Sequence, residues 1–312
     1  MEALFNPALI LFLLGIVVGL FFKILLPNSL SKFLGYYLLF ALGLKGGQSL
    51  QKNGFTDEVL SVLSLGAFFA ILIPLLSYLY LKNILNTDDA AALSGTYGSV
   101  SAVTYVTALT YLSTSNQNYD NFMSAVLVVM EFPAIFMALY LVTRRNSENK
   151  NNIETIKTAF MEIPNIVLIS SLIIGFSLNL NSLSQIELLT ETLFEYVLFV
   201  FLFVMGTRVA RRIGELTGKS KNLIMFALVT PIFGSLLALF AAFNFNLSVG
   251  NATLLMVLTA SASYIAVPAV VKDAIPNANP AIYLGLSLGV TFPFNIIFGI
   301  PLYNELAKYF IG

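Results

Sequence analysis

The most regular feature of the chain is the alternation of long apolar runs with short polar connections. A run of roughly 20 apolar residues is long enough to cross a lipid bilayer as a helix. Ten such runs cover residues 7–26, 31–50, 58–81, 89–114, 119–143, 163–181, 188–210, 221–244, 249–272 and 279–307. The pattern therefore predicts an all-α integral membrane protein with ten transmembrane helices.

One connection is long and polar enough to divide the chain into two parts. It covers residues 144–162 and begins Arg144-Arg-Asn-Ser-Glu-Asn-Lys-Asn-Asn152. We expect a single membrane domain made of two five-helix halves, residues 1–143 and 163–312, joined by this cytoplasmic linker.

Two of the ten runs are interrupted by small and hydroxyl residues at matching places. The fourth run contains Leu93-Ser-Gly-Thr-Tyr-Gly-Ser-Val-Ser101, and the ninth contains Leu258-Thr-Ala-Ser-Ala-Ser-Tyr-Ile-Ala266. In lipid, the backbone leaves the helix only where protein or a water-filled cavity satisfies its polar groups. Paired interruptions of this kind indicate the binding site of a secondary transporter. We therefore expect discontinuous helices in spans four and nine around a central cavity.

The two halves also share short matches in the same order. Residues 7–19 of span one parallel residues 164–175 of span six, and Leu39–Lys45 of span two aligns with Leu202–Arg208 of span seven. The pair Phe132-Pro133 of span five corresponds to Phe292-Pro293 of span ten. Because five helices is an odd number, a duplicated half enters the membrane upside down, so the matches predict an inverted repeat.

The positions of the basic residues predict the orientation. With ten spans, 13 of the 16 basic residues fall on one side of the membrane. Only Lys45, Lys52 and Lys308 fall on the other side. The basic side is expected to be cytoplasmic, which places both termini outside. The first side carries Lys23, Lys32, Lys82, Arg144, Arg145, Lys150, Lys157, Arg208, Arg211, Arg212, Lys219, Lys221 and Lys272.

Composition narrows the function. The chain is 58% apolar and 10% charged, with a mean hydropathy of +0.86, which is typical of a membrane protein. It contains no Cys and no His, which excludes disulfides, thiolate chemistry and the usual zinc or haem ligands. Its 16 basic and 16 acidic residues cancel, so charge gives no argument for a nucleic-acid partner. No nucleophile-base pair, metal cluster or phosphate loop indicates an enzyme or an organic cofactor.

The hydroxyl residues at the two breaks are the candidate ligands. Amides at a half-helix end suit an anion and free carbonyls suit sodium, while hydroxyls complete the shell of either. We expect the substrate near Gly98, Ser99, Ser101, Ser261, Ser263 and Tyr264. Ion coupling is expected at Thr96, Thr104, Glu131 and Thr259, with a sodium ion near Thr96 and Ser263. The alternative is that these small residues serve only close helix packing.

Charged residues inside the spans carry further hypotheses. Glu131 lies within span five, where an ionised acid costs roughly 2.5–3.5 kcal/mol on insertion scales. It is expected to face the interior as a sodium- or proton-coupling group, to pair with a buried cation, or to lie at the interface. Lys45 and Arg208 occupy equivalent repeat positions. They either attract anions at opposite mouths or extend to the lipid headgroups.

Several of these stretches resemble the SbtA-type sodium-dependent bicarbonate transporters, a bacterial permease family. The resemblance rests on Gly43–Gly47, Gly95–Thr104, Met130–Ala134, Val204–Gly206 with Arg212–Leu216, and Ala274–Pro280, in family order along nearly the whole chain. It implies a ten-helix, inverted-repeat homotrimer in the bacterial cytoplasmic membrane that imports bicarbonate with sodium. It also implies a cytoplasmic PII-like regulator in some members.

The chain departs from the family pattern at three places, one of which is the replacement of the family's glycine in the second break, around Ala266 and Val267. In span nine the family's serine run is followed by Asp, whereas this chain has Tyr264, and the linker after span five is shorter than in cyanobacterial members. These departures leave two alternatives to sodium-coupled bicarbonate import. One is a sodium-independent carrier of another small anion, and the other is a transport-inactive membrane sensor or scaffold.

Overall fold

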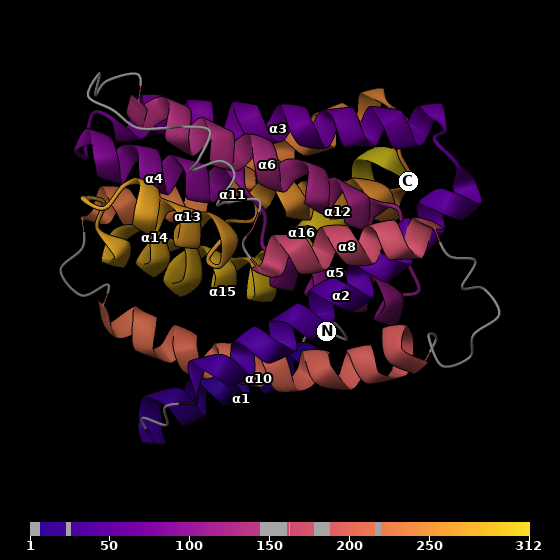
Figure 1. The fold of residues 1–312 in the computed structure, drawn as a ribbon, viewed down its shortest axis with the longest axis horizontal. Helices are drawn as coiled ribbons and strands as arrows, with labels where there is room; N and C mark the ends of the chain where they lie inside the picture. Colours follow the sequence, from indigo (N-terminus) through magenta and orange to yellow (C-terminus); the bar gives the residue numbers. More distant parts are fainter. Residues whose placement is uncertain (1–6, 23–25, 144–160, 162, 178–187, 216–219) are drawn as a thin grey trace.

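The computed structural model describes residues 7–22, 26–143, 161, 163–177, 188–215 and 220–312, and all regular secondary structure in these ranges is helical (Figure 1). The first half contains α1 (Pro7–Phe22), α2 (Asn28–Asn53), α3 (Asp57–Leu81), α4 (Thr87–Gly98), α5 (Ala102–Thr114) and α6 (Met123–Thr143). The second half contains α8 (Ile163–Ser177), the π-helix η2 (Leu188–Thr192), α10 (Leu193–Glu215), α11 (Lys221–Asn244), α12 (Val249–Ala260) and α13 (Ala266–Ala274). It ends with α14 (Pro280–Leu286), η3 (Ser287–Thr291), α15 (Phe292–Phe294), η4 (Asn295–Gly299) and α16 (Ile300–Ile311).

The described helices fall at the predicted apolar runs, but fewer than ten are continuous spans. Five helical stretches are long and apolar enough to cross a membrane, namely 57–81, 123–141, 188–212, 221–244 and 280–311. The fourth and ninth runs are each divided into two short helices. The linker at 144–162 lies outside the described residues except for Met161, as do six of the basic residues used for orientation: Lys23, Arg144, Arg145, Lys150, Lys157 and Lys219.

The outer surface of the molecule carries large apolar side chains. Phe21 is 78% exposed, Phe240 71% and Tyr309 82%, and many Leu, Ile and Phe residues on the same helices are exposed as well. An apolar surface of this extent would be unstable in water but matches the hydrocarbon of a bilayer. The molecule is therefore an integral membrane protein.

Four helices form one layer in which partners from the two halves cross each other. Helix α1 packs along α10, α2 packs along α8, and α2 also contacts α10 (Figure 1). The backbones approach closely at glycines. A Cβ at Gly206 would lie 2.2 Å from the carbonyl oxygen of Phe12, and one at Gly175 would lie 2.3 Å from that of Leu44. Small residues thus allow helix contact where lipid provides no hydrophobic driving force.

The remaining helices form a second layer, which contains the two interrupted spans. Helices α3, α4 and α6 pack on one another, and α11, α12 and α16 do likewise. Both interrupted spans begin with the same local cap. The Asn86 side-chain oxygen accepts a hydrogen bond from the Asp89 N–H at 2.8 Å, and the Ser248 hydroxyl accepts one from the Asn251 N–H at 3.3 Å. These caps satisfy amides that would otherwise be unpaired at the helix starts.

The capped residues also tie the two halves together. The Asp89 carboxylate accepts a hydrogen bond from the Asn279 N–H at 2.6 Å, just before α14. The Asn251 side-chain oxygen accepts one from the Asp120 N–H at 2.9 Å, just before α6, and its amide donates to the Asp120 carboxylate at 2.8 Å. Each interrupted span is therefore hydrogen-bonded to the residues just before a helix of the opposite half, α14 in one case and α6 in the other.

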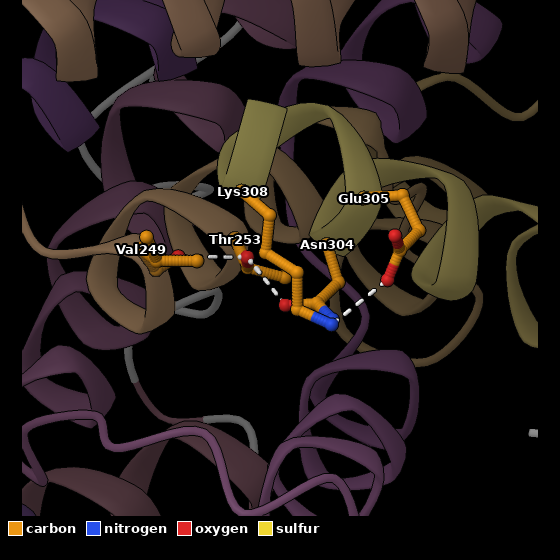
Figure 2. Close-up of polar contacts among 5 residues, drawn as sticks. All are labelled: Val249, Thr253, Asn304, Glu305 and Lys308. Carbon is orange, nitrogen blue, oxygen red and sulfur yellow. Dashed lines mark hydrogen bonds and ion pairs between the residues drawn. The ribbon is translucent and has the colours of Figure 1, made fainter. Parts of the chain in front are cut away.

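A polar contact between α12 and α16 lies deeper in this layer. Figure 2 shows the Thr253 hydroxyl directed toward both the Val249 carbonyl oxygen, at 2.8 Å, and the side-chain oxygen of Asn304, at 3.4 Å. Asn304 is fully buried. On the exposed side of the same helix, Lys308 pairs with Glu305 at 2.8 Å. The last helix is thus polar toward α12 and charged at its outer end.

The crossing of α2 and α8 predicts an uneven response to glycine substitution along α2. A Cβ at Gly43 would lie 1.9 Å from the Ser171 hydroxyl oxygen and 2.7 Å from the Leu168 carbonyl oxygen. At Gly35 the nearest atom is a ring carbon of Phe201 at 3.6 Å. Gly43→Ala is expected to destabilise the protein by roughly 1–3 kcal/mol through overpacking.

Gly35→Ala on the same helix is the matched control and should leave stability unchanged or slightly higher, because alanine favours the helix. Thermal unfolding in detergent, followed by circular dichroism, compares the two variants. Equal melting temperatures for both would contradict the close packing of α2 on α8.

Candidate functional site

The first break separates α4 from α5 at Ser99, Val100 and Ser101. Ser99 ends α4 with an extended backbone, and its N–H donates to the Gly95 carbonyl oxygen at 3.2 Å. Ser101 begins α5, where its hydroxyl accepts hydrogen bonds from the N–H of Thr104 at 3.2 Å and from the Thr104 hydroxyl at 2.9 Å. The predicted interruption is confirmed, and Thr104 stabilises the N-terminal cap of α5.

The second break separates α12 from α13 over residues 261–265. The Ser261 hydroxyl donates to the Leu258 carbonyl oxygen at 2.9 Å, which closes the end of α12. The Ser263 hydroxyl accepts a longer hydrogen bond from the Val267 N–H at 3.4 Å, in the first turn of α13. Serines thus take the cap positions on both sides of the first break and at the end of α12, whereas Ile265 stands at the N-cap of α13.

The two breaks are bonded directly to each other. The Ser101 N–H donates to the Ser261 hydroxyl oxygen at 2.9 Å, and the Ser263 N–H donates to the Thr96 carbonyl oxygen at 2.9 Å. All four residues are buried. Backbone groups freed by one broken helix are therefore satisfied by the other, as the membrane interior requires.

A small cavity lies beside this crossing and is called the inner cavity here. Its volume is about 40 Å³, and its polar lining consists of Ser101, Glu131, Asn165, Ser263 and Tyr264. A single water needs roughly 10–15 Å³ by the same measure. The inner cavity therefore accommodates a few waters or one small ion, in contact with both breaks and with α6 and α8.

Glu131 provides the carboxylate of the inner cavity. Its side chain is buried and accepts a hydrogen bond from the Ser99 hydroxyl at 2.7 Å. It forms no ion pair with any side chain in the described part of the chain. An acid in this position is costly to charge unless a cation or a proton neutralises it. Of the earlier alternatives, the interfacial position is wrong, because Glu131 faces the protein interior.

Several predicted site residues do not line the inner cavity. The hydroxyls of Thr96 and Thr259 donate to backbone carbonyls of their own helices, at 2.8 Å and 3.0 Å. A Cβ at Gly98 would lie 2.5 Å from the Pro74 ring, so this glycine allows α4 to pack on α3. For these three residues, hydrogen bonds within the helix or close helix packing explain the residue type.

Tyr264 lies at the edge of the inner cavity and packs on α15. Its ring meets that of Phe292 edge-on, with centroids 5.3 Å apart. Its hydroxyl lies near Ser101 and within electrostatic range of Arg208. No group in the described ranges satisfies the geometry of a hydrogen bond with it. The phenol therefore stands between the first break and a cationic residue of α10.

The structure adds residues that the sequence did not indicate. Asn295, at the start of η4, donates to the Ala260 carbonyl oxygen at 2.8 Å and accepts from the Tyr303 hydroxyl at 2.9 Å. It thereby satisfies the last turn of α12. A π-turn inserts one residue and changes the direction of a side chain, which is frequent at functional sites. The sequence signal that could have indicated Asn295 is an asparagine within an apolar run. The same signal marks Asn165, which lines the inner cavity.

No group of three or more acidic side chains in the described ranges could hold a metal ion. A cation at the inner cavity would have to use Glu131 together with hydroxyl and carbonyl oxygens. These hard oxygen donors are the type that sodium and similar ions prefer.

In an all-helical membrane protein, two interrupted helices that cross beside a polar cavity are typical of membrane transporters. Residues 7–308 match the Na⁺-dependent bicarbonate transporter superfamily, and the chain belongs to this superfamily. The resemblance seen in the sequence is confirmed by this match. No curated protein matches the chain significantly.

The contact of Asn295 with α12 predicts a graded pair of variants. Asn295→Ala removes the donor to the buried Ala260 carbonyl and should destabilise the fold by roughly 1–3 kcal/mol, since a buried acceptor loses its partner. Tyr303→Phe removes the hydrogen bond to Asn295 and the contact of the hydroxyl with Ser235 but leaves the Ala260 carbonyl paired, and should cost about 1 kcal/mol or less.

Both variants can be compared by thermal unfolding in detergent at constant sodium concentration. A larger loss for Tyr303→Phe than for Asn295→Ala would be incompatible with Asn295 as the group that caps α12.

Proposed function

We propose that the protein imports bicarbonate, or a similar small inorganic anion, by sodium-coupled symport with alternating access. The observation that carries this proposal is the inner cavity, where both breaks and Glu131 meet. Membership of the bicarbonate transporter superfamily supports the substrate class.

The anion is assigned to the side of the inner cavity formed by the starts of α5 and α13. Helix N-termini carry partial positive charge and favour anions. Ser101 and Ser263 stand at these starts and line the cavity. In the observed contacts both hydroxyls act as acceptors, so each retains a hydrogen for an oxyanion.

Sodium is assigned to the opposite side, near Glu131 and the ends of the half-helices. Glu131 supplies a formal charge, Ser99 fixes its orientation, and the carbonyl ends of α4 and α12 carry partial negative charge. The proposed position is near Thr96 and Ser263, whose backbones are bonded to each other. This arrangement would replace the aspartate that the family carries at the position of Tyr264.

The contacts within the four-helix layer support an inverted repeat of ten spans. In each half a basic residue follows a polar residue by seventeen positions, Asn28 and Lys45 in the first and Glu191 and Arg208 in the second. Lys45 pairs with Glu191 at 3.2 Å, and Arg208 donates to Asn28 at 2.9 Å. One contact is thus repeated with the halves exchanged, as a two-fold axis in the membrane plane requires.

The further properties rest on charge and on the family resemblance. The basic side is proposed to face the cytoplasm, with both termini outside the bacterial inner membrane. A homotrimer and a cytoplasmic PII-like regulator are proposed from the resemblance alone.

A second candidate function is a transport-inactive sensor or scaffold. Tyr264 favours it, because a bulky phenol lies at the edge of the inner cavity in place of the family's acid. Such a protein would bind bicarbonate without carrying it across the membrane. A sodium-independent carrier would instead transport the anion at the same rate with and without sodium.

Uptake of labelled bicarbonate into proteoliposomes tests the proposal. The parent protein should show uptake stimulated by an inward sodium gradient, and Glu131→Gln should lose this stimulation because the cation loses its charged ligand. Ser263→Ala is expected to lower uptake about tenfold or more, equivalent to roughly 1.4 kcal/mol.

Ser94→Ala is the matched control, because the Ser94 hydroxyl donates only to the Ala90 carbonyl within α4, at 2.6 Å. It should transport like the parent. Binding without uptake by the folded, inserted parent would favour the sensor, and equal uptake without sodium would favour the uncoupled carrier.

A stoichiometry of one sodium to one bicarbonate predicts that uptake does not respond to voltage. One sodium with one bicarbonate carries no net charge, whereas each uncompensated charge gains about 2.3 kcal/mol per 100 mV. Potassium-valinomycin potentials of either sign should leave the accumulation ratio unchanged. A tenfold sodium gradient, worth about 1.4 kcal/mol, should sustain about tenfold accumulation. Accumulation that follows the imposed voltage would require a second sodium.

A further inference from the structure

A second, larger cavity adjoins the inner cavity and is called the basic cavity here. Its volume is about 310 Å³, and it is enclosed by parts of α2, α5, α10 and α14. Both cavities are lined by Ala102, Val103, Tyr264 and Ile265, which follow the two breaks, and by Leu39 and Pro164. The two spaces are therefore neighbours separated by the residues that follow the two breaks.

The charged side chains described in the lining of the basic cavity are all positive. Lys32, Arg208 and Arg212 line it, and none of the described lining residues is acidic. Cations gathered in a cavity with apolar walls raise the local concentration of anions, because the low-dielectric walls focus the field. Its chemistry therefore fits an anionic ligand.

Arg208 lines the basic cavity and lies within electrostatic range of Tyr264, which borders both cavities. Its repeat equivalent, Lys45, is neutralised by Glu191 at 3.2 Å. Arg208 meets Asn28 at the corresponding position, and an uncharged amide accepts one hydrogen bond without neutralising the guanidinium. No described residue forms an ion pair with Arg208. The exchange of an acid for an amide leaves Arg208 without a formal counter-charge among the described residues.

Two unpaired donors point to the same place. In the described part of the chain, neither the buried Arg208 Nε nor the buried Tyr264 hydroxyl meets the geometry of a hydrogen bond, although the phenol lies close to the Ser101 hydroxyl. The Arg208 and Tyr264 side chains lie within electrostatic range of each other. A buried donor without an acceptor is unfavourable. Both groups are donors, so one oxyanion reaching them would satisfy both. Neither atom is open to solvent, so such a ligand would have to displace the Tyr264 side chain.

We propose that the basic cavity is a second anion site, specific for a small oxyanion held by Arg208 with Lys32 and Arg212. Tyr264 separates it from the inner cavity and joins the two sites when its side chain turns. The assignment of the bound oxyanion as the transported one rests on the proposed function; the site itself does not. The site explains why Arg208 and Lys45 play different roles despite equivalent positions.

The absence of cysteine from the chain permits a direct test. Leu284 lines the basic cavity, so Leu284→Cys introduces a single reporter thiol. In detergent, the rates of modification by an anionic and a cationic methanethiosulfonate reagent are measured at constant ionic strength, with sodium chloride or with sodium bicarbonate. The anionic reagent should react faster than the cationic one, and bicarbonate should slow it.

Variants in the reporter background locate the site. Arg208→Gln should abolish protection by bicarbonate and lower the anionic-to-cationic rate ratio about tenfold, the effect of one poorly screened charge. Arg208→Lys should retain the rate ratio. Lys45→Gln is the matched control, since it removes the equivalent charge from outside the cavity, and should change neither quantity.

The remaining outcomes separate the second site from the inner one. Protection that survives Arg208→Gln in folded protein overturns the proposal. Protection that is lost equally in Ser263→Ala also overturns it, because the anion would then act from the inner cavity. Protection that depends on Arg208 while proteoliposomes show no uptake supports the site and argues against the transport function.

Discussion

The structure depends on one constraint, which is that every backbone polar group inside a membrane needs a partner within the protein. Two interrupted helices would each leave amides and carbonyls unpaired near the membrane centre. The molecule resolves this by crossing the two breaks, so that Ser101 bonds to Ser261 and the backbone of Ser263 bonds to Thr96. A polar cavity is possible at this depth because the surrounding backbone is already satisfied.

The sequence predicted the features that appear as a change in the residue pattern. It did not predict those that depend on the three-dimensional contacts of a side chain. Both breaks were predicted because hydroxyl residues interrupt apolar runs, and Glu131 because an acid within a span is rare. The distinction between ligand and packing residue could not be made from residue type. Ser263 lines the inner cavity, whereas Thr259 bonds to its own helix and Gly98 makes room for Pro74. Asn295 was not predicted as a site residue because a π-turn, which no sequence pattern signals, directs its side chain to the Ala260 carbonyl oxygen.

The polar ties also bear on how the molecule can move. The starts of the interrupted spans are bonded to the opposite half through Asp89 with Asn279 and Asn251 with Asp120, and the breaks are bonded to each other. Separating the two interrupted spans would expose these groups to lipid. The two interrupted spans and the helix starts bonded to them therefore form one linked polar unit.

One amide makes the surroundings of Lys45 and Arg208 electrically unequal although the formal net charge of the chain is zero. At one end Lys45 is balanced by Glu191, and at the other Arg208 faces Asn28, which carries no charge. An anion therefore meets an ion pair at the Lys45 end and, at the Arg208 end, a cation without a formal counter-charge among the described residues. At equal concentrations, the Arg208 end attracts an anion more strongly.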